Sequence, residues 1–229
     1  MSTLNTGHVL FTATNWWFGR LTSLFTGPPF HAGIGKDSEH VCDHTLFNSD
    51  RGVLKSGIRT TPWCKRVDEL SEKGSDWAIL GPPTDITLEQ RGIFARELAK
   101  QAKSARYSVA ELFLQPLDVL RNRRKGIYLT PDSVRYRRAG DIWKSGKICS
   151  KQVGTILHKM GMVPHFATYF SPAELYRYLL LHAHYKVVTH SEPRPDWIAE
   201  YDEPDSCSWD SDDAAQGACP ETDYPVGAC

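Results

Sequence analysis

The chain has 229 residues, of which 41% are hydrophobic and 24% are charged, and its formal net charge is zero. This composition is typical of one soluble globular domain, alone or with an appendage. No run of 18 apolar residues occurs, and the start, MSTLNTGHVLFTATNWW, has no basic segment followed by an apolar one. We therefore expect no transmembrane segment and no signal peptide, which favours a cytoplasmic or virion-associated location.

The first third of the chain predicts a small, mostly antiparallel sheet. Short segments rich in β-branched and apolar residues alternate with glycine, proline and polar turns. The predicted strands are 7–15, 30–35, 40–47, Val53–Arg59 and Asp76–Leu80. Pro82 and Pro83 end this sheet-rich part.

From Thr87 onward, apolar residues recur at helical spacing. Thr87 and Gln90 have the spacing of a capping box, which predicts the start of a helix. Two predicted helices begin near Thr87 and Cys149, and two more cover 109–120 and 171–183. Strands followed by helices predict an α+β domain over residues 1–190, with the small sheet packed on the helices.

Cys149 lies at the leading edge of a predicted amphipathic helix, whose apolar face includes Val153, Ile156, Leu157 and Met160. A helix N-terminus offers free N–H groups and the positive end of the helix dipole, both of which stabilise a thiolate. Cys149 is therefore either a small buried core residue or a nucleophile. The second role requires a nearby histidine and a polar residue that orients it.

His31 is the candidate base, because it opens a short apolar strand where a histidine without a partner would be costly to bury. Asp43 lies in the next predicted strand, so its carboxylate can reach the imidazole if the two strands pair. A strand-end histidine and a surface carboxylate are the plainer alternatives. His44, beside Asp43, could take the third role instead.

The motifs FHAGIG, HVCDHT, AKSARYSVAEL, KICSKQVGTILHKMGM and SPAELYRYL follow one another along the chain. In this order they resemble the circularly permuted papain-like thiol hydrolases, over roughly residues 7 to 185. The resemblance implies a permuted papain-like fold with Cys149 as nucleophile, His31 as base and Asp43 as orienting residue. Family members more often have a glutamate where this chain has Asp43.

The family includes NlpC-type cell-wall peptidases, lipid-ester hydrolases and lecithin-retinol-type acyltransferases. The resemblance therefore implies a cysteine hydrolase that cleaves an amide or ester bond through an acyl-enzyme, without a cofactor or a metal. A peptide bond of peptidoglycan is the first expected substrate, cleaved by a phage or virion-associated enzyme, and a lipid ester is the second. The alternative class is a non-catalytic structural or interaction module of a viral particle.

Residues 191–229 are predicted to form a separate acidic tail. Eleven of the 27 acids but only one of the 27 bases lie from Glu192 onward, which leaves 26 bases and 16 acids in the rest of the chain. Opposite charges allow the tail to dock on the body or on a protein partner. The tail also holds three cysteines whose redox state the sequence leaves open: Cys207, Cys219 and Cys229.

Two basic clusters, RNRRKG and RYRRAG, have the composition of a surface that contacts nucleic acid or another polyanion. A solvated loop, or a docking site for the acidic tail, explains them equally well. Nucleic acid is therefore not the expected partner, and a peptide- or acyl-containing substrate is.

Overall fold

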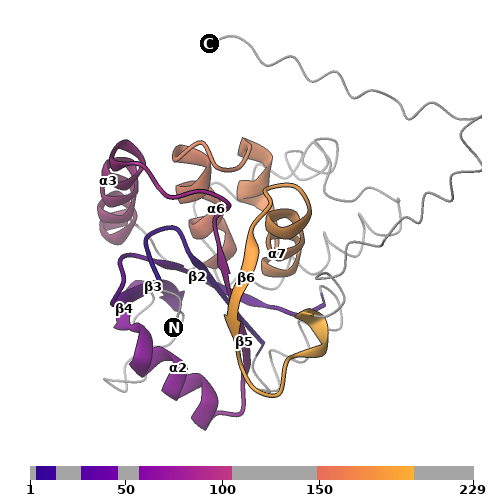
Figure 1. Ribbon diagram of the computed structural model, residues 1–229. Coiled ribbons are helices and arrows are strands. Elements are labelled where there is room, and N and C mark those ends of the chain that lie inside the picture. The colour runs from indigo at the N-terminus through magenta and orange to yellow at the C-terminus, as the bar shows by residue number, and fades with distance from the viewer. Residues whose placement is uncertain (1–3, 14–26, 46–56, 105–148, 199–229) are drawn as a thin grey trace, which may run out of the picture.

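The computed structural model describes residues 4–13, 27–45, 57–104 and 149–198, which form an α+β fold (Figure 1). Its strands are β1 (Val9–Ala13), β2 (His31–Gly35), β3 (His40–Thr45), β4 (Gly57–Pro62), β5 (Asp76–Gly81) and β6 (Lys186–His190). Its helices are α2 (Trp63–Glu72), α3 (Leu88–Ser104), α6 (Cys149–Lys159), the 3-10 helix η3 (His165–Tyr169) and α7 (Pro172–Leu181). The predicted α+β class is confirmed.

All six strands belong to one antiparallel sheet with the order β4-β3-β2-β1-β5-β6. The strand predicted to end at Arg59 continues through Pro62, and α2 and β6 were not predicted. The apolar face of α2 is short, with Trp63 and Leu70 buried and Val67 partly buried, and β6 is a short edge strand. The helix predicted at 109–120 lies outside the described residues.

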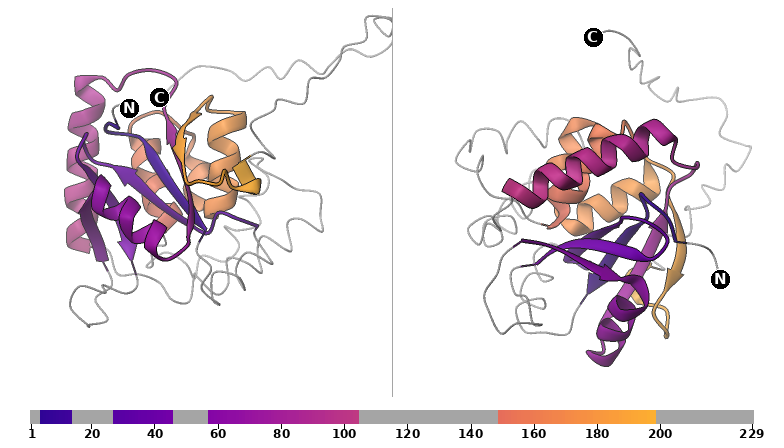
Figure 2. Two further views of the ribbon diagram at one scale, coloured as in Figure 1. Left: turned by 60° about the horizontal axis from the view of Figure 1, so that its bottom comes forward. Right: turned by 90° about the vertical axis from the view of Figure 1, so that its left-hand side faces the viewer.

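The central strand β1 is buried on both faces, so the sheet separates two cores. Val9 and Phe11 belong to the larger core, together with residues of α3, α6 and α7. Leu10, between them, points to the opposite face and joins the smaller core with Trp63 and Leu70 of α2. Helices therefore cover both faces of the sheet, with α2 opposite the other helices (Figure 2).

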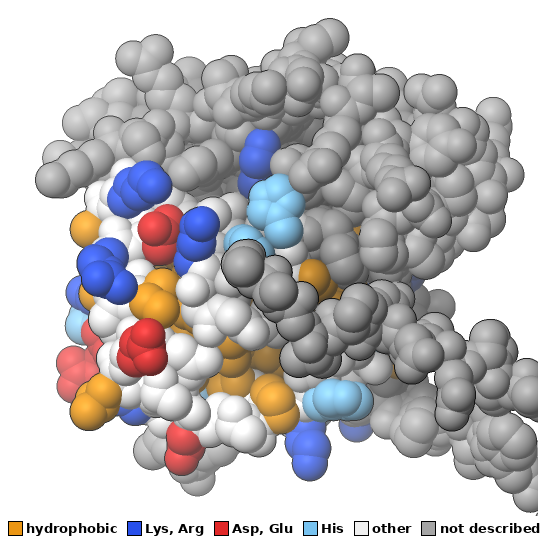
Figure 3. Space-filling view, turned by 90° about the horizontal axis from the view of Figure 1, so that it is seen from above, with side chains coloured by type: hydrophobic (Ala, Val, Ile, Leu, Met, Phe, Trp, Pro, Cys, Tyr) orange, Lys and Arg blue, Asp and Glu red, His pale blue; other side chains and the backbone are white. Residues whose placement is uncertain are grey.

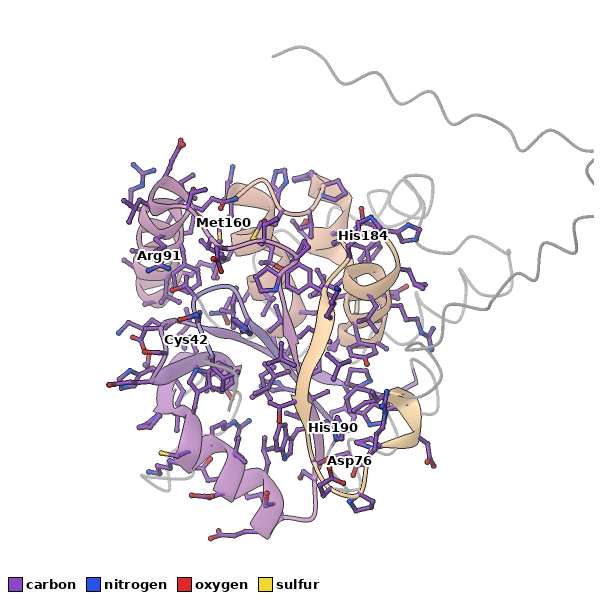
Figure 4. The ribbon with its side chains drawn as sticks, in the orientation of Figure 1. Cys42, Asp76, Arg91, Met160, His184 and His190 are labelled. Atoms are coloured by element: carbon purple, nitrogen blue, oxygen red, sulfur yellow. The ribbon has the colours of Figure 1, made fainter. Side chains whose placement is uncertain are left out.

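The start of α3 lies beside the end of α6. Gln90 donates a hydrogen bond from Nε2 to the carbonyl of Met160, just past α6, at 3.0 Å. Figure 4 labels Met160 and Arg91 in this same upper region. The predicted capping box is present, because the Thr87 N–H donates to Gln90 Oε1 at 3.0 Å and the Gln90 N–H donates to Thr87 Oγ1 at 3.2 Å.

A close backbone contact fixes the position of α6 against η3. A Cβ on Gly154 would lie 2.9 Å from the carbonyl oxygen of Ala167 and 3.1 Å from the Cα of Thr168. These are backbone atoms, which cannot move aside as a side-chain end can. Glycine at this position therefore allows the helix that begins at Cys149 to sit close to its neighbour.

Part of the segment predicted as the acidic tail packs against the domain. Trp197 and Ile198 are buried in the larger core, and the Trp197 ring contacts the Tyr176 ring with centroids 5.1 Å apart. The Ser191 N–H also donates to the carbonyl of Trp77 at 2.9 Å. Residues 199–229 lie outside the described residues. Within the described ranges, no helix combines the length and apolar character needed to cross a bilayer.

Candidate active site

His31 and Asp43 face each other across two paired strands. His31 begins β2, and the register pairs Gly33, two residues further on, with Asp43 of β3. Because side chains alternate along a strand, His31 lies on the same face as Asp43. The imidazole Nε2 is 3.4 Å from Asp43 Oδ2, and the two side chains are 17% and 0% exposed.

Gly33 keeps the space between these two strands free. A Cβ at this position would lie 3.1 Å from the Cβ of Asp43 and 3.2 Å from the carbonyl oxygen of Cys42. Both contacts are tighter than ordinary van der Waals contact. A larger residue would therefore press on the strand that carries the Asp43 carboxylate.

Cys149 is the first residue of α6 and is only 2% exposed. Burial by itself raises the pKa of a thiol, but the positive charge of His31 and a hydrogen bond with its imidazole lower the Cys149 pKa below its ordinary value. Hydrogen bonds from the backbone N–H groups of Ala32 and Ser150 add to this lowering. The first turn of α6 contains no acidic residue that would oppose it.

The His31 pKa moves in the direction that complements this thiolate. Burial lowers it, but the negative charge at Cys149 and hydrogen bonds with Asp43 and Cys149 outweigh burial and raise the pKa from 6.5 to about 9. The shifts of the Cys149 and His31 pKa values therefore both favour a thiolate and imidazolium pair. Because Nε2 contacts Asp43, Nδ1 is the nitrogen left to exchange a proton with the sulfur.

Another buried cysteine shows that burial alone does not produce a thiolate. Cys42 lies on β3, labelled in Figure 4, and its sulfur shares a hydrogen bond with Thr60 Oγ1 at 3.3 Å. Burial raises the pKa of the Cys42 thiol, more than this hydrogen bond lowers it, so Cys42 stays protonated near neutral pH. The largest difference between Cys42 and Cys149 is the histidine beside Cys149, to which the backbone N–H hydrogen bonds add.

Asp43 has a second charged partner, which lies in α2 on the same face of the sheet. The Arg66 guanidinium of α2 lies 2.9 Å from Asp43 Oδ2 and 3.3 Å from a carboxylate oxygen of Glu69. Glu69 also pairs with Arg59 of β4. Burial raises the Asp43 pKa, but its hydrogen bond with His31 and the charges of Arg66, His31 and Arg59 lower it below its ordinary value.

Arg66 and Glu69 are not among the predicted site residues, because α2 was not predicted from the sequence. One local signal existed, since Arg66 lies in the first turn of a helix, where the dipole favours acidic side chains. That unfavourable placement is compensated by Asp43, which belongs to a strand far away in sequence.

Of the predicted site residues, the structure brings Cys149, His31 and Asp43 together. His44 pairs through its backbone with Ile58, and its side chain lies outside the described part of the chain. The basic clusters and the three tail cysteines also lie outside it. Among the described residues, no three His, Cys, Asp or Glu side chains gather closely enough to bind a metal ion.

The face seen from above carries both signs of charge around exposed hydrophobic side chains (Figure 3). No protein-family model matches the chain, and no curated protein matches it. The interpretation of the site therefore depends on its own geometry and chemistry.

Proposed function

We propose that this chain is a cysteine hydrolase of the circularly permuted papain-like type, which cleaves an amide or ester bond through an acyl-enzyme. Cys149 is the nucleophile, His31 is the general acid and base, and Asp43 orients the imidazole. One observation carries the proposal. A thiol at a helix N-terminus has its pKa lowered by a histidine that a buried carboxylate holds in place.

The first half of the reaction forms the acyl-enzyme. The Cys149 thiolate attacks the substrate carbonyl carbon and forms a C–S bond, and the carbonyl oxygen becomes an oxyanion. N–H groups at the start of α6 are suited to stabilise that charge. The His31 imidazolium then donates its proton to the leaving amine or alcohol as the C–N or C–O bond breaks.

The second half of the reaction releases the acid. Neutral His31 takes a proton from water, the hydroxide equivalent attacks the thioester carbonyl, and the C–S bond breaks. The products are a carboxylic acid and the restored thiolate and imidazolium pair. Asp43 stays ionised throughout, because its role is to stabilise the imidazolium and fix its orientation.

A peptide bond of peptidoglycan, cleaved in a phage or virion-associated setting, is the substrate we propose first, because the resemblance of the His31 and Cys149 motifs extends to cell-wall peptidases. A lipid ester is the second, since its carbonyl undergoes the same two steps. Purified protein incubated with peptidoglycan, and separately with vesicles of an ester lipid, distinguishes the two by the product released. Cys149→Ala should abolish whichever reaction occurs.

The nucleophile is tested without knowing the substrate. The ultraviolet absorbance of thiolate is followed from acidic to alkaline pH in the wild type and in Cys149→Ser. We expect a thiolate at neutral pH that disappears in Cys149→Ser, because His31 lowers the Cys149 pKa. Cys42→Ser is the matched control, since it removes a buried thiol that is neutral at that pH. Equal absorbance near pH 7 in wild type and Cys149→Ser would refute the proposed nucleophile.

A further inference from the structure

Two basic side chains, His31 and Arg66, contact the same oxygen of the Asp43 carboxylate. His31 Nε2 lies 3.4 Å from Oδ2 and an Arg66 nitrogen lies 2.9 Å from the same atom, while Asp43 itself is fully buried. Oδ1 has no hydrogen-bonding partner. The orientation of the carboxylate toward the imidazole therefore depends on Oδ2 being held between His31 and Arg66.

The position of Arg66 follows from the helix that carries it. Trp63 and Leu70 of α2 are buried in the smaller core with Val41 of β3. Arg66 is three residues after Trp63 and four before Leu70, so it shares their helical face. Asp43 is two residues after Val41 and therefore shares its face of the sheet. The packing of α2 thus directs the guanidinium to the carboxylate.

Arg66 is followed by further charged side chains of alternating sign, Glu69 and then Arg59. Glu69 accepts from Arg66 at 3.3 Å and also pairs with Arg59, and the Arg66 side chain is only 11% exposed. Glu69 therefore contacts Nη1 of the guanidinium, while Asp43 contacts Nη2. The guanidinium is a planar donor that can engage two carboxylates at once, which a lysine ammonium does less well.

We propose that Arg66 is a positioning residue of this site, which acts through Asp43 to keep the carboxylate ionised and aimed at His31. The proposal rests on the proposed function, because it assigns a role within the same reaction. Within the described residues Arg66 contacts Asp43 and Glu69, and the charges that set the His31 pKa are those of Cys149 and Asp43. Its influence on the reacting groups therefore passes through Asp43.

The charged groups around Asp43 come from every neighbouring element. They are His31 of β2, Arg59 of β4 and Arg66 of α2, and Cys149 of α6 faces His31 in turn. Removing the Arg66 charge removes one of the contributions that offset burial, so the Asp43 pKa rises although His31 and Arg59 still lower it. Asp43 then takes up a proton at a higher pH, and the imidazolium and the thiolate lose its support at that higher pH.

The test is the pH midpoint at which the Cys149 thiolate appears, measured by its absorbance. For Arg66→Gln we expect the midpoint to rise, because Asp43 without the adjacent guanidinium supports the imidazolium and the thiolate less well. Arg66→Lys keeps the charge but not the two-sided contact, so it should give a smaller rise. Lys65→Gln is the matched control, because it removes the same charge from an exposed neighbour in the same helical turn.

The route through Asp43 is tested by combining variants. In an Asp43→Asn background, Arg66→Gln should leave the thiolate midpoint unchanged, because the group through which Arg66 acts is gone. This double variant also avoids a buried unpaired carboxylate, so it is informative even if Arg66→Gln does not fold.

Two results would overturn the proposal. One is an unchanged midpoint in every folded Arg66 variant, and the other is an equal shift with and without Asp43. Neither result contradicts the proposed cysteine hydrolase function, provided that the Cys149 pKa in the wild type is below its ordinary value. If that pKa is not lowered, the proposed function itself fails, and Arg66 has no thiolate to support.

Discussion

The charge at Cys149 should control the titration of His31, and Cys149→Ser removes that charge. The His31 pKa of about 9 lies above the ordinary 6.5 by an amount that corresponds to roughly 3 kcal/mol favouring the imidazolium, at about 1.4 kcal/mol per unit. Burial opposes this, and the Cys149 charge is the largest contribution that raises the pKa. We therefore expect Cys149→Ser to lower the His31 pKa by about 1–2 units.

The assay is nuclear magnetic resonance of the histidine ring signals as a function of pH, with His31 assigned by its loss in His31→Gln. Cys42→Ser is the control, because it replaces a buried thiol of the neighbouring strand that carries no charge at neutral pH. The His31 titration should be unaffected by Cys42→Ser. A wild-type His31 that titrates near 6.5, or one that Cys149→Ser leaves near 9, would refute the coupling of the two groups.

Two further results are expected. Gly33→Ala should raise the pH midpoint of the Cys149 thiolate and cost about 1–3 kcal/mol of stability by overpacking, because the new Cβ presses on Asp43. The control Gly57→Ala adds a Cβ in open space and should change neither the midpoint nor the stability. Equal effects of the two substitutions would contradict this prediction. The difference in unfolding free energy between wild type and a His31→Gln, Cys149→Ser double variant should fall less between pH 6.5 and about 9 than the His31 contribution alone would require. The His31 contribution is complete below 6.5 and is lost as the pH rises through about 9, whereas the lowered Cys149 pKa gives a contribution that is complete above 9.0 and is lost as the pH falls, so the two oppose each other below pH 9. Denaturant titrations at several pH values measure this difference, and a fall over this range as large as the His31 contribution alone would mean that the Cys149 pKa is not lowered.

The sequence by itself determined the local elements that carry the three candidate residues. Cys149 could be placed at a helix start because the apolar residues after it repeat every three to four positions, which is a pattern read within a few turns. His31 and Asp43 could be placed on neighbouring strands because the polar turn between them is short. The capping box at Thr87 likewise needs only residues three apart.

Only the tertiary structure decided how these elements meet. β1 pairs with β5 as well as with β2, and β6 joins the sheet from the far end of the described chain. No local pattern encodes such pairings, because they depend on which faces bury together once the whole core forms. The same is true of Arg66, whose helix has few buried residues and whose partner lies on another strand. The pKa values of Cys149 and His31 are likewise tertiary properties, since each depends on a charge that folding brings close.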